Sequence, residues 1–116
     1  MESSIEQRIS QVVAEISKKR SAKVEETDSG EVHLIVEDIL VFAAKPLEHS
    51  IKVAMLPDVF TYSTFPNDYR VGQLHFDGKG YLAIYFDVEE CDLADVFEVV
   101  KDAVIDLNLY GYQVTT

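Results

Sequence analysis

Apolar residues recur along this chain in two rhythms, and the change between them restricts the fold more than any other feature. Near both ends they return every three or four residues, as on the buried side of an amphipathic helix. The two stripes are Ile5, Ile9, Val12, Val13 and Ile16, and then Leu93, Val96, Phe97, Val100, Ala103, Val104 and Leu107. Between them lie short β-branched and aromatic runs typical of strands. The order helix, strands, helix predicts an α+β fold.

Capping signals indicate where the two helices begin and end. The segment Ser3-Ser4-Ile5-Glu6 is typical of a capping box and predicts a helix over about 4–21. The cations Lys18, Lys19, Arg20 and Lys23 follow, and we expect them to complement the negative end of that helix dipole. Asp92, with Asp95 three residues later, predicts the start of the second helix, and Gly111 can end that segment.

Three apolar segments, 32–36, 39–44 and 51–56, predict the first strands, after a polar loop over 25–30. Glu37-Asp38 fits either a tight hairpin turn or a bulge within one strand. Pro46 ends the second segment, because proline cannot donate to a sheet ladder. The connector 58–65 is either a short helix begun by Pro57 or another strand.

A β-hairpin is predicted over 71–87, with a glycine-containing loop at 77–80 and a further loop before it at 66–68. In its second strand, Leu82, Ile84 and Phe86 alternate with Tyr81, Ala83 and Tyr85. One strand face is therefore apolar and the other presents two tyrosines. We predict one domain over 1–116: a two-layer α+β sandwich in which amphipathic N- and C-terminal helices flank an antiparallel sheet of about five strands.

The lone cysteine, Cys91, excludes an internal disulfide and a cysteine-based zinc site. Its neighbours are acidic, which favours an incidental thiol over a nucleophile. The N-terminus lacks the basic and apolar regions of a secretory signal, and no apolar run approaches the ~20 residues that span a membrane. These features predict a cytoplasmic protein.

Charge restricts the partners. The chain has 21 acidic against 10 basic residues, a formal net charge of −11. Residues 1–24 are net +2 and 25–116 are net −13, and 81–116 alone carry eight acids and one lysine. Such a surface repels nucleic acids and anionic membranes and attracts basic proteins.

The strongest functional hypothesis combines that charge with tyrosines, which are common at interfaces and can stack on cationic side chains. It describes a non-enzymatic acidic module that sequesters or inhibits a basic partner, as toxin-immunity proteins or other antagonists do, for example by occluding a nuclease-like toxin. The residues expected to contact the partner are Tyr81, Tyr85, Asp87, Glu89, Glu90, Asp95, Glu98 and Asp102.

Patterns for other chemistry are incomplete, so no metal and no cofactor is expected. His33 and His75 lie on predicted strands and could be neighbours, but no third ligand has suitable spacing. The glycines between 72 and 80 do not match a phosphate loop, and the acidic cluster over 87–95 lacks the glycine and final glutamate of a calcium loop. A small enzyme using His33 or His75 with a carboxylate is the third hypothesis.

The run over 70–86, followed by the helix from Asp92, resembles the last hairpin and helix of type III secretion chaperones and of YbjN-like domains. The leading helix and three strands also fit that order. This resemblance implies a small acidic homodimer that binds an extended segment of another protein, such as a secreted effector, without catalysis. It supplies the alternative to the antagonist hypothesis.

Overall fold

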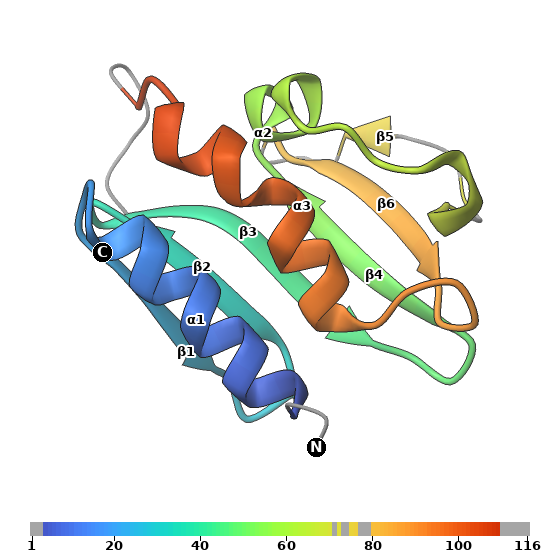
Figure 1. The fold of residues 1–116 in the computed structure, drawn as a ribbon. Helices are drawn as coiled ribbons and strands as arrows, with labels where there is room; N and C mark the ends of the chain where they lie inside the picture. Colours follow the sequence, from blue (N-terminus) through green and yellow to red (C-terminus); the bar gives the residue numbers. More distant parts are fainter. Residues whose placement is uncertain (1–3, 71, 73–74, 77–79, 110–116) are drawn as a thin grey trace.

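Helices α1 and α3 lie side by side on one face of an antiparallel sheet (Figure 1). The structure is a computed structural model that describes residues 4–70, 72, 75–76 (backbone) and 80–109. The helices are α1 Ile5–Ser17, α2 Pro57–Tyr62 and α3 Leu93–Asp106, with a 3-10 turn, η1, at Asn67–Tyr69. The strands are β1 Ala22–Glu26, β2 Val32–Val36, β3 Ile39–Pro46, β4 Ser50–Met55, β5 His75–Phe76 and β6 Leu82–Asp87. The predicted α+β class, with its antiparallel sheet and terminal helices, is confirmed.

The sheet has six strands in the order β1-β2-β3-β4-β6-β5, one more than the approximate number predicted. The addition is β1, which begins before the expected polar loop and includes two of its residues, Glu25 and Glu26. β1 is an edge strand with exposed Lys23, Glu25 and Glu26, so only Ala22 and Val24 carry an apolar signal. Sequence reasoning missed it because charged edge strands look like loops.

Helix α1 also differs from its prediction in both caps. Its N-terminal capping box joins Ser4 to Gln7, not to Glu6: the Gln7 amide donates to Ser4 Oγ at 3.0 Å and the Ser4 amide to Gln7 Oε1 at 3.2 Å. The helix ends at Ser17, about four residues early, and no basic residue occupies its last turn. The basic cluster therefore begins at the C-cap residue, Lys18, and lies just beyond the last turn of α1.

Both ambiguous connections have definite forms. Glu37 and Asp38 make a two-residue hairpin turn between β2 and β3, with φ angles of 52° and 65°. A bulge is present as well, because Val41 is an extra residue between the pairs Ile35–Leu40 and Leu34–Phe42. The connector after β4 is helical, with Pro57 in its first turn.

The core lies between the sheet and the two long helices. Leu82, Ile84 and Phe86 are buried, as the alternation in this strand predicts. Phe42 on β3 meets Phe97 on α3 edge to face, with ring centroids 4.9 Å apart. Helix α3 buries most of its predicted stripe but ends at Asp106, before Gly111, which lies outside the described residues together with Tyr110 and Tyr112.

The turn at Glu37-Asp38 generates a stability prediction. Side-chain-bearing residues are strained at positive φ, whereas glycine is not. Asp38→Gly should raise the free energy of unfolding by about 0.5–1 kcal/mol, measured by urea denaturation. Asp28→Gly is the control, since Asp28 lies in an exposed turn without positive φ and should show no gain. Equal effects of the two substitutions would contradict the strain argument.

Candidate functional site

The eight residues expected to form one contact surface do not lie together. Tyr81 and Tyr85 are on the face of the sheet opposite α3, because their strand neighbours point into the core beneath that helix. Asp95, Glu98 and Asp102 lie on α3 itself. Asp87, Glu89 and Glu90 lie at the end of β6 and in the turn between the two elements. The alternation in the sequence places the tyrosines and Leu82 on opposite faces of the sheet, but it does not show which of the two faces the helices cover.

Both tyrosines have internal roles. The Tyr81 hydroxyl donates to the Leu40 carbonyl oxygen at 2.7 Å, so its polar end is bound to β3. The Tyr85 ring is half-buried against Gly72, where a Cβ atom would lie 2.9 Å from Tyr85 Cδ2. Only glycine permits this close approach without displacing the ring.

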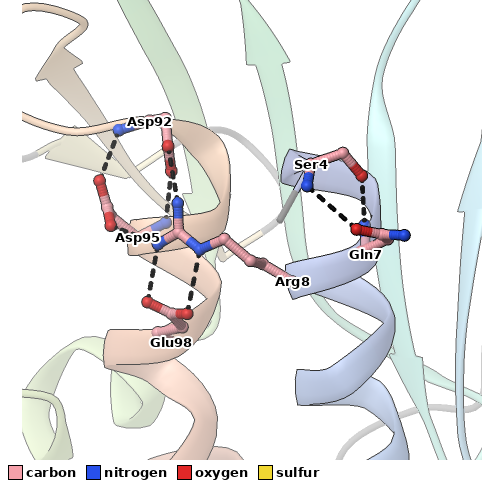
Figure 2. Close-up of polar contacts among 6 residues, drawn as sticks. All are labelled: Ser4, Gln7, Arg8, Asp92, Asp95 and Glu98. Atoms are coloured by element: carbon pink, nitrogen blue, oxygen red, sulfur yellow. Dashed lines mark hydrogen bonds and ion pairs between the residues drawn. The ribbon is translucent and has the colours of Figure 1, made fainter. Parts of the chain in front are cut away.

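Acidic residues between β6 and α3 also stabilise the local backbone. The Glu89 amide donates to Asp87 Oδ1 at 2.9 Å, and the Asp87 carbonyl accepts from Glu90 and Cys91. Asp92 and Asp95 cap α3 reciprocally, each side chain accepting from the other's amide at 2.8 Å (Figure 2). This confirms the predicted Asp92 cap. Exposed Glu89 and Glu90 remain available to solvent.

Arg8 of α1 reaches across to the N-terminal end of α3 and binds three carboxylates (Figure 2). Its guanidinium lies 2.9 Å from Asp92, 2.6 Å from Asp95 and 2.9 Å from Glu98. The hydrogen bonds with Glu98 and Asp95 raise the Arg8 pKa above its ordinary value. Two of the expected contact residues, Asp95 and Glu98, are thus engaged within the molecule, where one guanidinium offsets one of three carboxylate charges.

Two further contacts show that α1 and α3 run parallel. Lys101 binds Glu15 at 2.6 Å. Nearer the C-terminal end of α3, Arg20 Nη1 donates to the carbonyl oxygens of Val104 at 3.1 Å and Leu107 at 2.6 Å. Arg20 therefore complements the C-terminal end of α3, not that of its own helix, because the parallel neighbour brings those carbonyls beside the chain leaving α1.

A second acidic surface lies between α2 and the C-terminal half of α3. A hollow of about 550 Å³ is lined there by Asp58, Tyr62, Asp102, Ala103, Asp106, Leu107 and Asn108. Tyr62 is 72% exposed, the highest value among the large apolar side chains that stand out from the described surface. Exposed Asp102 and Asp106 form no ion pair with a residue that the structure describes. We name this the α2–α3 acidic hollow.

Sequence reasoning identified only Asp102 of this hollow as a contact residue. Asp106 follows Asp102 at helical spacing, so the signal for a shared face was present. Asp58 and Tyr62 were missed because the connector could be helix or strand, and only a helix places both beside α3.

The histidine and cysteine predictions have different outcomes. His33 and His75 are not neighbours: the register runs His33–Ala43–Ala54–Ala83–His75, four strand spacings or about 19 Å. Instead, His33 Nε2 lies 2.9 Å from Glu31 Oε1 beside the exposed sheet face. Burial, with help from Asp95 and Asp92, raises the pKa of the Cys91 thiol to about 11, which suits an unreactive side chain.

Within the described part of the chain, no group of three or more His, Cys, Asp or Glu residues could hold a metal ion. No helix there is long and apolar enough to cross a bilayer. Comparison with protein-family models, curated proteins and solved structures finds no significant match.

The Arg8 cluster predicts a measurable contribution to stability. Arg8→Met should lower the free energy of unfolding by about 1–2 kcal/mol, because it removes charge-assisted bonds in a partly buried site. Lys23→Met is the control: its ion pair with Glu25 is exposed, at 59% and 53%, and should contribute almost nothing. Similar losses in the two variants would contradict the cluster's role.

The same cluster predicts a pH dependence. Burial acts to raise the Asp95 pKa, but the hydrogen bonds from the Asp92 amide and Arg8 outweigh it, and the pKa lies below its ordinary value. A lowered folded-state pKa contributes stability above the unfolded pKa, about 3.9, that is lost as the pH falls. The stability difference between the wild type and Arg8→Met should therefore narrow below about pH 4 in urea titrations. A constant difference would contradict this account.

Proposed function

We propose that this protein is a non-enzymatic module that binds a basic partner protein through the α2–α3 acidic hollow and thereby sequesters or inhibits it. The observation that carries the proposal is the exposed Tyr62 ring beside Asp102 and Asp106, two carboxylates without a described ion-pair partner. Every α3 carboxylate nearer the N-terminus than Lys101 is bound by Arg8. The hollow therefore contains the α3 carboxylates that no described cation binds.

The chemistry of the hollow suits an Arg or Lys side chain. A cation over the face of a tyrosine is attracted by the ring, and adjacent carboxylates can accept its N–H groups. Apolar Ala103 and Leu107 complete the lining and can pack against the aliphatic part of such a side chain. One or two cationic side chains of the partner would fit a space of about 550 Å³.

The remaining charge acts at longer range. A net charge of −11 attracts a basic partner before contact and accelerates association. Glu89 and Glu90 lie at the opposite end of α3, about 20 Å away, so they would contribute mainly through this field. Asp95 and Glu98 would contribute less, because Arg8 offsets their charge.

The test compares a variant that lacks the tyrosine and two carboxylates of the hollow with a control variant of the same net charge. Three tagged proteins are purified from the native host, and the proteins bound to each are identified. They are the wild type, the triple variant Tyr62→Ala/Asp102→Asn/Asp106→Asn and the control variant Asp28→Asn/Asp68→Asn. Wild type and control should retain a basic protein that the triple variant loses. With that protein in hand, the triple variant should associate about tenfold more slowly and with a weaker salt dependence. Unchanged capture by the triple variant would overturn the proposal.

A second function is favoured by a different groove. Helix α1 and edge strand β1 enclose about 380 Å³ lined by Ile9, Val13, Val24, Val32, Ser10, Glu6 and Glu26. The floor is apolar, both glutamates are exposed, and β1 has no described strand on its outer side. An extended segment could add to that edge and place alternate side chains in the groove. This mode corresponds to the alternative of a homodimeric binding protein resembling secretion chaperones or YbjN-like domains.

The two functions respond to different substitutions. Val13→Asp places a charge in the α1–β1 groove, where Val13 is only half-buried, and should abolish capture of an extended segment. It should leave binding at the α2–α3 acidic hollow intact. Light scattering of the wild type tests the accompanying homodimer, and a strictly monomeric protein whose capture survives Val13→Asp would exclude this second function.

A further inference from the structure

We propose that the sheet face opposite α1 and α3 binds a small organic carboxylate with a slender apolar body. No described helix covers this face, and it contains a hollow of about 410 Å³. Its lining residues lie on β2, β3, β4 and β6 or directly beside them. The site is independent of the α2–α3 acidic hollow and has the opposite charge preference.

Alanines form the floor of this hollow. Ala43, Ala54 and Ala83 pair directly across β3, β4 and β6, so three neighbouring strands present only methyl groups along one row. The side chains that flank this row, two residues away or, for Leu40, three because of the bulge at Val41, are larger. Leu40 and Tyr81 lie toward one side and Lys45 and Lys52 toward the other, with the two flanking rows about 13 Å apart along the strands. The result is a shallow furrow with an apolar base.

Tyr81 is a fixed part of this furrow. Its hydroxyl donates to the Leu40 carbonyl oxygen at 2.7 Å, which holds the ring against β3. A ring held in this way gives the furrow an apolar wall without the loss of conformational freedom that an exposed tyrosine would suffer on binding. The furrow is therefore preformed for a narrow apolar group.

The charged side of the furrow selects an anion. Lys45 and Lys52 are directly opposite each other on β3 and β4, an arrangement of like charges that destabilises a sheet. Neither forms an ion pair with a described residue. The hollow's own carboxylate, Glu31, is bound to His33 at 2.9 Å. Since opposed Cβ atoms lie about 5 Å apart, one carboxylate can receive N–H groups from both ammonium groups.

The size favours a small molecule over a protein segment. Small-molecule sites occupy roughly 300–1,000 Å³, and this hollow lies near the lower end of that range. The two lysines of the hollow can bind one carboxylate between them, whereas an acidic protein segment with several carboxylates would require a row of cations. An eight-carbon carboxylate combines the required charge with a body narrow enough for the alanine floor.

The experiment titrates the full chain with octanoate and follows backbone amides by NMR. Octanoate should produce saturable shifts at Ala43, Ala54 and Ala83. Octyltrimethylammonium, which has the same body and the opposite charge, should not, and neither should acetate or inorganic phosphate, which lack the body. Saturable shifts with acetate or with phosphate would overturn the role of the apolar furrow. Saturable shifts with octyltrimethylammonium would overturn the role of the lysines.

Matched variants locate the site. Lys45→Gln/Lys52→Gln should weaken octanoate binding about tenfold or more, because two charge-assisted bonds are lost. Lys18→Gln/Lys19→Gln makes the same change of net charge on the exposed segment after α1 and should leave binding unchanged. Equal weakening of octanoate binding in the two double variants would show that only the net charge matters, and it would overturn the proposal. Tighter binding of a capped glutamate-rich peptide than of octanoate would also overturn it, since the face would then fit an acidic protein segment.

Discussion

The packing of α1 against α3 determines how the rest of this molecule is arranged. The two helices come from opposite ends of the chain, run parallel and together cover one face of the sheet. Parallel neighbours align their dipoles unfavourably, and contacts along the seam offset that cost. Arg8 binds the carboxylates at the start of α3, Lys101 binds Glu15 at its middle, and Arg20 binds the carbonyls at its end. These contacts fix the helix pair in one register over the core.

That seam also redistributes the charge of the protein. Two of the five cations in residues 1–24 contact α3: Arg8 binds its N-terminal carboxylates and Arg20 its terminal carbonyls, so Arg8 offsets part of the negative charge at the start of α3. Asp102 and Asp106, beside exposed Tyr62, form no ion pair with a described residue. On the opposite side of the sheet, Lys45 and Lys52 lack such partners among the described residues. The fold thus places the two proposed sites, one acidic and one with two lysines, on opposite sides of the sheet.

Particular residues show how far local patterns reach. The stripe from Leu93 to Val104, the cap at Asp92 and the alternation through β6 were predictable, because each depends on neighbours within a turn or along a strand. β1 was not, because an edge strand with Lys23 and Glu25 facing solvent has almost no apolar signal. The hairpin at Glu37-Asp38 could not be distinguished from a bulge because Glu-Asp is not a favoured two-residue turn, and pairing of β2 with β3 imposes the positive φ angles.

The sequence by itself determined the class of this protein: an α+β chain with an antiparallel sheet, an amphipathic helix at each end, and an acidic C-terminal third. These properties follow from periodicity and composition, which are local or additive. Only the tertiary structure decided which charges are free. Arg8 and Glu98 are 90 positions apart in the sequence, and Tyr62 joins Asp106 only when α2 packs beside α3. Tyr81 and Asp102 are close in the chain but lie on opposite sides of the sheet. Pairing across such separations depends on how the layers stack, and a linear pattern does not contain that information.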